Sequence, residues 1–484
     1  MVVVTRLPGF AFGVLNIDES DFVLIGRRIV EGALPYVDIV DHKPPLTYLT
    51  YAFGGLFGPA SMAPMRVLSI AWILGTLLLV ERAAREWTGD ELAGRAAAWL
   101  ALLANFCELP IVNSEVLMNL PAAAALLWFV RSVRQPRARS LLLCGACIGL
   151  SSLFRHQGAV LAILAVAFLP NLLAPLTMAA GFLLPWAAAA GFYAATGHLA
   201  EFNDWVFVRN FAYASQDSRA VLGNLLHSLA ICIPAVLLPW ALAVRETVRP
   251  VAPGSRTRTG LLLALWSTWL AVASGGRFYE HYFVQFAPLL GIVAAPAAAD
   301  LVRRWDALAK VRRGAILLAA ALPALGLMTY AFARGMAGQY PAQDPRANAV
   351  ADWLRANTQR SDTLFVWGHF SPVFYLAQRE QGTRYQTCSV HVGNYDPAQL
   401  PPGFAPARHV SRRDVENTLE DLERNRVPVV VDTAPADIHG WGRMPLATVP
   451  GLRDYLAANY HVVAHPGGAD VYLRNGGGSA AAAR

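Results

Sequence analysis

Residues 65–84 read MRVLSIAWILGTLLLVERAA, an apolar run that closes in charged residues. A straight membrane-spanning helix needs roughly 20 apolar residues, and runs of this character recur along the chain. They predict a polytopic α-helical membrane protein. The runs cover 65–84, 93–109, 116–131, 139–154, 157–170, 174–193, 222–244, 260–274, 281–299 and 314–333.

Residues 1–17 look like the second half of one more span, and they lack the small-residue cleavage site of a signal peptide. We expect a first helix that is short or truncated at a misplaced start. Together with the ten apolar runs, this first helix gives a prediction of about 11 membrane spans.

The composition agrees with a membrane protein. Of 484 residues, 55% are hydrophobic and 15% are charged, whereas a soluble protein has about 25% charged residues. This shortfall excludes a soluble enzyme, a disordered chain and a fibrous one. The net charge of +7 comes from arginines between the apolar runs, so it is no sign of nucleic-acid binding. Lys43 and Lys310 are the only lysines.

Arginines crowd the loops after alternate runs, which the positive-inside rule places in the cytoplasm. The prediction is therefore an inner-membrane protein whose residues 18–64 form a long first loop outside the cytoplasm. Residues 1–335 are expected to form the membrane module. The more polar C-terminal part would also lie outside.

Residues 336–475 have ordinary polarity and predict a small α/β domain. Thr363–Trp367 and Val427–Asp432 are expected to be buried strands, and His461–Leu473 to contain a third. Helices are expected at 346–358 and 411–424, the second with Ser411 as its N-cap. The tail 476–484 is low in complexity and predicted to be disordered.

Lys43-Pro44-Pro45 precedes an apolar helix, expected from Leu46 to Phe57, that is too short to cross the membrane. Two prolines suit a first helical turn, and the partial positive charge there adds to that of Lys43. Together they would anchor a phosphate at headgroup depth. On these residues alone, a lysine that extends to the interface beside a structural turn is the simpler interpretation.

Asp18 and Glu19 stand where the first span leaves the membrane. A carboxylate there could take a proton from an acceptor hydroxyl; a helix start with Asp as N-cap is the simpler alternative. Arg277, Tyr279 and His281 could hold a second side of a phosphate or pyrophosphate-like group. They could equally be an interfacial anchor of aromatic and basic residues.

The sequence leaves metal binding open. His42, His156 and His281 could bind a divalent ion together with Glu108 or Glu115, but their spacing matches no metal motif. Cys144 and Cys147 have thioredoxin-like spacing but lie in an apolar run, which favours helix packing. No Walker or Rossmann glycine pattern is present, so a nucleotide donor has no recognisable site.

Several motifs together resemble the bacterial membrane glycosyltransferases of the GT-C type, families 39 and 83. That group includes the protein O-mannosyltransferases and the lipid A aminoarabinose transferase. The motifs are Asp18-Glu19, the amphipathic stretch FVLIGRRIVEG (22–32), Asp41-His42-Lys43-Pro44-Pro45-Leu46, Asn113-Ser-Glu115, Gly276-Arg-Phe-Tyr-Glu-His-Tyr282 and Phe365-Val-Trp-Gly368. The resemblance is specific in residues 18–46 and moderately so in 276–286.

The resemblance implies a GT-C fold and a reaction. Such enzymes move a sugar from a polyprenyl-phosphate donor to an envelope acceptor outside the cytoplasm, with inversion at the anomeric carbon. By position, Asp18 would be the general base and Glu19 would help to orient the acceptor, while Lys43 and Arg277 would bind the donor phosphate. The further cleft candidates are His42, Glu115, Arg155, Tyr279 and His281.

One departure bears on the metal. The aminoarabinose transferase has an acidic residue just before its Lys-Pro-Pro, associated with a metal, whereas this chain has His42. A transporter or flippase of lipid-linked sugars is the main alternative function, but such proteins usually place ionisable residues near the bilayer midplane. A cell-envelope assembly protein is a third; it would need an exposed apolar patch on residues 336–484.

Overall fold

The computed structural model describes residues 1–57, 61–169, 171–214, 221–250, 255–393, 395, 400 and 403–476. Each of the ten predicted apolar runs is helical over most of its length. These runs form α4 (Ala63–Thr88), α5 (Glu91–Ala104) with η1 (Asn105–Cys107), α6 (Ser114–Arg134), α7 (Ala138–Phe154), η2 (His156–Phe168), α8 (Leu173–Ala195), α11 (Val221–Val248), α12 (Arg256–Ala273), η4 (Glu280–Phe286) with α13 (Ala287–Arg303), and α14 (Lys310–Met336).

Six of these helices are long and apolar enough to cross a membrane within the described residues: α4, α6, α8, α11, η4 with α13, and α14. The helices α1 (Val2–Phe12), α7 and η2 are apolar but shorter. The polytopic helical character is thus confirmed, while the number of eleven spans stays a prediction.

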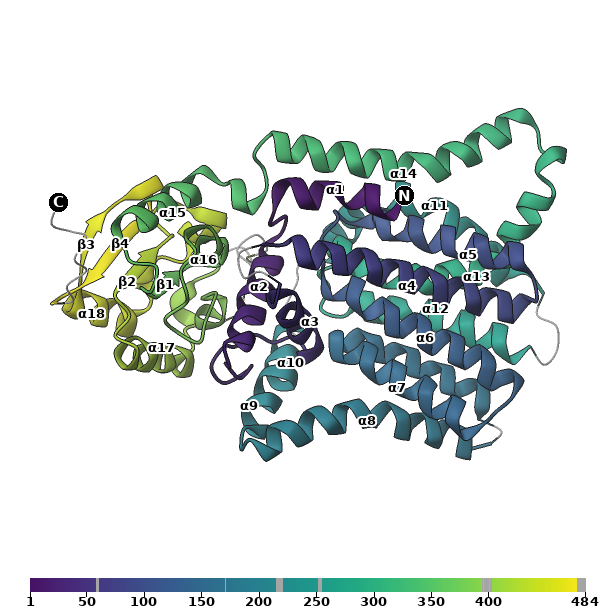
Figure 1. Cartoon of the computed structure of the whole chain (residues 1–484), viewed down its shortest axis with the longest axis horizontal. Helices are drawn as coiled ribbons and strands as arrows, with labels where there is room; N and C mark the ends of the chain where they lie inside the picture. Colours follow the sequence, from purple (N-terminus) through teal and green to yellow (C-terminus); the bar gives the residue numbers. More distant parts are fainter. Residues whose placement is uncertain are drawn as a thin grey trace.

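The helices lie roughly side by side as one bundle, with α14 and α1 along one edge and α8 along the opposite edge (Figure 1). Small residues allow this close packing. A Cβ on Gly145 of α7 would stand 1.9 Å from the carbonyl oxygen of Met178 in α8. The neighbouring Cys144 is also buried, and its thiol donates to the Ala125 carbonyl of α6 over 3.4 Å. Cys144 is therefore a packing residue.

Short helices lie at one end of the bundle, between it and the C-terminal sheet (Figure 1). The predicted short helix after Lys43 is α3 (Pro45–Gly55), with Pro45 in its first turn, and it packs against α2 (Ile17–Val30). A Cβ on Gly26 of α2 would lie 2.5 Å from the Tyr51 backbone, so the two helices touch directly. The remaining elements at this end are α9 (Leu199–Asn203), η3 (Asp204–Val208) and α10 (Arg209–Ala214). A short turn, η5 (Trp305–Ala307), precedes α14.

The C-terminal unit (residues 345–474) contains a four-stranded sheet in the order β1-β2-β4-β3. β1 (Leu364–Trp367) and β2 (Val429–Asp432) run parallel to each other, and both strands are buried. The stretch 461–473, predicted to contain one strand, forms two: β3 (Tyr460–Ala464) and β4 (Asp470–Arg474) pair antiparallel around a turn at Gly467 and Gly468. Periodicity could not resolve this turn, because the hairpin is so short.

The two expected helices are α15 (Pro345–Asn357) and α17 (Arg412–Arg424), and the Ser411 hydroxyl caps the second by accepting from the Asp414 amide. The tail 476–484 was predicted to be disordered; from residue 477 onward it lies outside the residues that the structure describes. The other short elements of this part are η6 (Pro341–Gln343), α16 (Pro372–Ala377), η7 (Ser389–Val392), η9 (Pro406–Arg408), η10 (Ile438–Arg443), η11 (Leu446–Thr448), α18 (Pro450–Asn459) and η12 (Pro466–Gly468).

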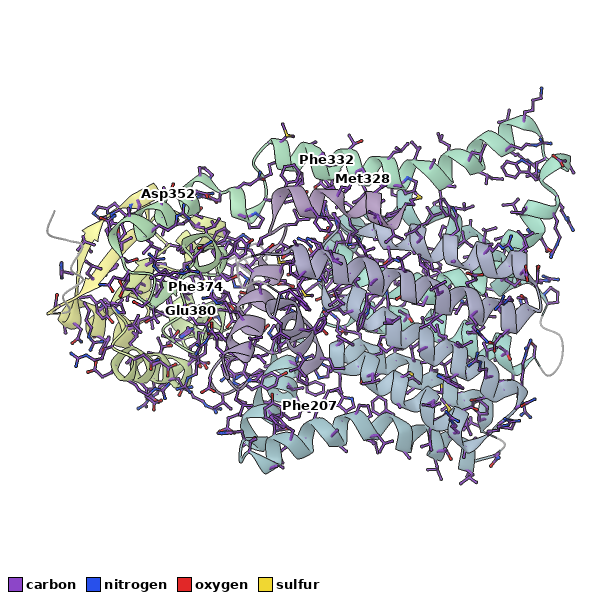
Figure 2. The ribbon with its side chains drawn as sticks, in the orientation of Figure 1. Phe207, Met328, Phe332, Asp352, Phe374 and Glu380 are labelled. Carbon is purple, nitrogen blue, oxygen red and sulfur yellow. The ribbon has the colours of Figure 1, made fainter. Side chains whose placement is uncertain are left out.

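Helix α2 connects the bundle to the C-terminal unit. Its Ile17 and Leu24 belong to the same buried cluster as Phe374 of α16. An ion pair joins Arg27 of α2 to Glu380. Phe374 and Glu380 both lie in the C-terminal unit on its side toward the bundle (Figure 2). The helix that begins with Asp18 is therefore fixed to both parts of the molecule.

Candidate active site

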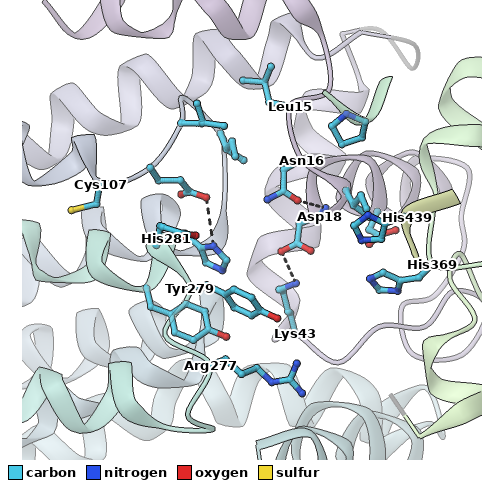
Figure 3. Close-up of a pocket in the computed structure, with 18 of the residues that line it drawn as sticks. Leu15, Asn16, Asp18, Lys43, Cys107, Arg277, Tyr279, His281, His369 and His439 are labelled. Carbon is cyan, nitrogen blue, oxygen red and sulfur yellow. Dashed lines mark hydrogen bonds and ion pairs between the residues drawn. The ribbon is translucent and has the colours of Figure 1, made fainter. Parts of the chain in front are cut away.

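A cavity of about 1280 Å³ lies where the bundle, the short helices and the C-terminal unit meet. Asp18 and Lys43 line it together with side chains from α11, α14 and the C-terminal unit. Arg277, Tyr279 and His281 line it from the segment before α13 (Figure 3). Residues predicted from distant parts of the sequence thus share one space.

Asp18 and Lys43 form the central pair of this cavity. The Lys43 Nζ atom lies 3.4 Å from Asp18 Oδ2 (Figure 3). It also stands 4.6 Å above the centre of the Phe22 ring. The lysine and the carboxylate are both partly accessible, at 15% and 34% of the side-chain surface. A ligand that enters the cavity therefore meets both charges at once.

Two tyrosines fix the backbone of Lys43. The Tyr36 hydroxyl donates to the Lys43 carbonyl over 2.7 Å, and the Lys43 amide donates to the Tyr48 hydroxyl over 3.0 Å. Both rings are buried. The ammonium group is thereby held at the cavity instead of extending freely toward solvent, as the alternative interpretation of the sequence required.

Asp18 stands in the first turn of α2, where its amide donates to the side chain of the N-cap residue Asn16. Burial opposes the charge of the carboxyl group, but the nearby Lys43 and His281 together outweigh burial and lower the pKa of Asp18 below its ordinary value. The group is therefore a carboxylate at neutral pH, which is the state that a general base needs.

Glu19 points the opposite way. Its side chain is fully buried and forms an ion pair with Arg66 of α4, itself fully buried. The two carboxylate oxygens also accept from the Leu15 amide over 3.0 Å and from the Val112 amide over 2.8 Å. With its oxygens engaged in this way, Glu19 positions the start of α2, and its side chain is not among the residues that line the cavity. Its role in orienting an acceptor stays a prediction.

Arg66 completes this buried group. Its guanidinium donates to the carbonyls of Gly9, Gly13 and Pro110, at 3.3, 2.8 and 3.1 Å. A Cβ on Gly9 would come within 2.6 Å of Arg66 Nε, so only glycine fits there. The Glu19–Arg66 group therefore ties together α1, α2, α4 and the loop before α6.

On the other side of Asp18, the cleft candidates form a connected network. His281 lies 3.6 Å from Glu108 and 3.7 Å from Glu115, and an ion pair of 2.5 Å links Glu115 to Arg155. Glu115 is fully buried, so it reaches the cavity through its two partners. The Arg155 guanidinium also stacks 4.3 Å above a tyrosine ring of η4.

The ring of Tyr279 stacks on His281, at 5.4 Å between centroids and 12° between planes. Arg277 is 7% exposed and lines the cavity near Tyr279 (Figure 3). Together they give this wall of the cavity a cationic and aromatic character. Arginine and a neighbouring aromatic hydroxyl suit the recognition of a phosphate.

His42 also lines the cavity, but its imidazole is directed to the neighbouring Asp41, with 2.9 Å between Nδ1 and Oδ1. His156 stacks on Trp186 at 5.8 Å. Within the described ranges, no group of three His, Cys, Asp or Glu side chains is arranged to hold a metal ion.

Three residues that the structure brings into or beside the site were not predicted from the sequence: Arg66, His369 and His439. Arg66 could have been noticed as an arginine inside the apolar run 65–84. His369 and His439 line the cavity from the C-terminal unit, 70 positions apart in the sequence. No local pattern distinguishes these histidines, because the packing of two loops alone brings them together.

Comparisons with known proteins identify a similar family and similar folds. The family model of dolichyl-phosphate-mannose-protein mannosyltransferase matches residues 41–196. No curated protein sequence matches the chain.

Solved structures match over nearly the whole chain. ArnT from Cupriavidus metallidurans bound to undecaprenyl phosphate has a TM-score of 0.61 at 16% identity, and the match covers 97% of this chain and 96% of that one. Its apo state matches with the same TM-score at 15% identity, over 97% and 95% of the two chains. The Archaeoglobus fulgidus oligosaccharyltransferase, tethered to an acceptor peptide, has a TM-score of 0.54 at 14% identity, over 95% of this chain and 72% of that one.

These findings show that the chain has the fold of the GT-C type glycosyltransferases. The expected resemblance to the GT-C type glycosyltransferases is thereby confirmed.

Replacing Glu19 by Gln tests the positioning role of the buried pair. The change leaves the charge of Arg66 buried without a counter-ion, which typically costs about 3–5 kcal/mol. We expect a marked fall in the melting temperature of the detergent-solubilised protein. Glu91→Gln is the matched control, because Glu91 pairs with Arg95 at the surface and both are exposed. Equal melting temperatures for the two variants would contradict the positioning role.

Proposed function

We propose that the protein is an inverting glycosyltransferase that moves a sugar from a polyprenyl-phosphate donor to an envelope acceptor on the extracytoplasmic side of the inner membrane. The observation that carries the proposal is the Asp18–Lys43 pair, 3.4 Å apart in a cavity that Arg277 also lines. The family-model match and a GT-C structure that was solved with undecaprenyl phosphate support it.

In this proposal the donor phosphate binds Lys43 and Arg277. The acceptor hydroxyl attacks the anomeric carbon from the face opposite the phosphate, and the bond from that carbon to the phosphate oxygen breaks. Asp18 takes the hydroxyl proton, and polyprenyl phosphate leaves with the bonding electrons. The two cations stabilise the negative charge that develops on the leaving phosphate.

The direct contact between Asp18 and Lys43 gives the donor a second role. Without donor, the lysine charge holds the Asp18 carboxylate in its less basic state. A phosphate anion that pairs with Lys43 offsets this charge and raises the basicity of Asp18. Donor binding would therefore prepare the base, and an acceptor that arrives first would meet a weaker one.

The distribution of charge favours transfer over transport. Asp18, Lys43, Arg155 and Arg277 all line a cavity at one end of the bundle. A transporter typically has ionisable or broken-helix residues near the bilayer midplane. The flippase alternative would gain support if lipid-linked sugar moved between leaflets in vesicles that contain the Asp18→Asn variant.

Asp18→Asn keeps the size of the side chain and removes the base. We expect the rate of sugar transfer to fall by roughly 10²–10⁴-fold, the usual contribution of general-base catalysis. Undecaprenyl phosphate should still bind, since Lys43 and Arg277 are unchanged. Transfer is measured as label moved from a radiolabelled polyprenyl-phosphate sugar, and wild-type activity of the variant would remove Asp18 from the mechanism.

Lys43→Ala deletes a charge-assisted contact to the donor phosphate, worth about 1.5–3 kcal/mol. The expected result is a rise in the dissociation constant for undecaprenyl phosphate of roughly 10–100-fold. Lys310→Ala is the matched control, because the only other lysine of the chain is exposed at the start of α14. If both variants bind undecaprenyl phosphate as tightly as the wild type, Lys43 is not the phosphate anchor.

The orientation is tested separately. Alkaline phosphatase and green fluorescent protein report opposite sides of the membrane when each is fused to the C-terminus. We expect active phosphatase and no fluorescence, because the arginine-rich loops belong in the cytoplasm. Fluorescence without phosphatase activity would place the C-terminal unit, and the cavity beside it, on the cytoplasmic side.

A further inference from the structure

We propose that the C-terminal unit supplies the acceptor platform of this active site: His369 and His439 hold a sugar ring of a glycan or glycolipid acceptor next to Asp18. This inference rests on the proposed glycosyltransferase function and adds the class of acceptor and the residues that select it.

The platform lies where the topology of the sheet creates a binding edge. β1 and β2 are parallel neighbours, with Trp367 paired to Asp432 at their carboxyl ends. The loop after β1 carries His369, and the loop after β2 leads into η10, which carries His439. Ligands of open α/β sheets characteristically bind outside the carboxyl ends of parallel strands. Here that edge faces the cavity.

The two histidines form a layered aromatic surface. Their ring centroids are 5.7 Å apart with planes 23° from parallel, and His369 stacks in turn on Trp441 at 6.4 Å and 20°. Phe370 lies 6.1 Å from His439. The backbone at His439 has φ of 55°, a left-handed conformation that is strained for a residue with a side chain. The loop thus adopts a strained backbone while its ring stays in the stack.

This platform is tied to the catalytic helix. The hydroxyls of Ser20 in α2 and Ser371, two residues after His369, are hydrogen-bonded over 2.6 Å and buried. Asp18 lies two residues before Ser20. In Figure 3, His369 and His439 lie on one side of Asp18, and Tyr279 and His281 lie on the other. The base therefore stands between a wall with Arg277 and the histidine wall.

The chemistry of the histidine wall fits a neutral sugar. The segments 368–371 and 433–441 contain no lysine or arginine. Arg346 reaches the carbonyls of Ala436 and Asp437, but its charge is paired with Asp344. Flat rings with polar edges combine an apolar face for the C–H side of a pyranose with hydrogen-bonding groups for its hydroxyls. The donor phosphate is attracted to Lys43 and Arg277, which leaves this wall for the acceptor. A peptide acceptor is the competing class.

The test measures transfer by the full-length protein in detergent. The probes are the glycolipid fraction and the protein fraction extracted from cells that lack the gene, since both contain unmodified acceptor. The donor is a radiolabelled polyprenyl-phosphate sugar. With the wild type we expect label in the glycolipid fraction. With His439→Asn we expect the amount of glycolipid fraction that gives half-maximal rate to rise about tenfold or more. Asparagine tolerates the left-handed backbone, so this variant removes the ring and not the fold.

His369→Phe keeps a flat ring and should retain most of the acceptor affinity, whereas His369→Ala should lose it. His461→Ala is the control, because His461 lies on β3, exposed and bonded to Asn475. Binding of undecaprenyl phosphate should be unchanged in all four variants. The proposed acceptor platform would be overturned if His439→Asn needed the same amount of glycolipid fraction for half-maximal rate as the wild type. Label in the protein fraction would also overturn it. Transfer by the wild type to neither fraction would overturn the proposed function itself.

Discussion

The buried ion pair between Glu19 and Arg66 is the constraint on which the rest of the site depends. Two full charges are removed from water at the end of a helical bundle. This is tolerated because both carboxylate oxygens of Glu19 and all three guanidinium nitrogens of Arg66 are hydrogen-bonded. The pair ties the start of α2 to α1, to α4 and to the loop before α6. Asp18 is the residue next to Glu19, so its position follows from this arrangement.

Adjacent carboxylates in one motif therefore have different tasks. In a helix, neighbouring side chains point about 100° apart, so one of two consecutive acids can face the protein interior while the other faces a cavity. Glu19 is enclosed and paired, and Asp18 is accessible and pairs with Lys43. Lys43 is itself held by two buried tyrosines. The backbone of Lys43 is thus fixed, which is the kind of close positioning that catalysis needs.

The sequence predicted much of the fold because membrane helices carry a strong, local signal. All ten apolar runs are helical, and the strands 363–367 and 427–432 were located to within two residues. The motif from Asp18 to Lys43 was expected at one cavity, and the structure brings these two side chains together. The prediction failed where the signal is short: one strand expected in 461–473 is a hairpin. The orientation and the number of spans remain predictions.

The sequence by itself determined that this chain is a helical membrane protein with a polar α/β part, and which residues carry the charges that matter. Composition and hydrophobic runs decide this, because the bilayer excludes unpaired charges and open backbone. Only the tertiary structure decided that Glu19 turns inward, that Glu115 reaches the cavity through Arg155 and His281, and that His369 and His439 stand beside Asp18. Contacts between segments tens or hundreds of residues apart leave no local pattern in the chain, and they form only when the packed helices and the sheet fix those segments in space.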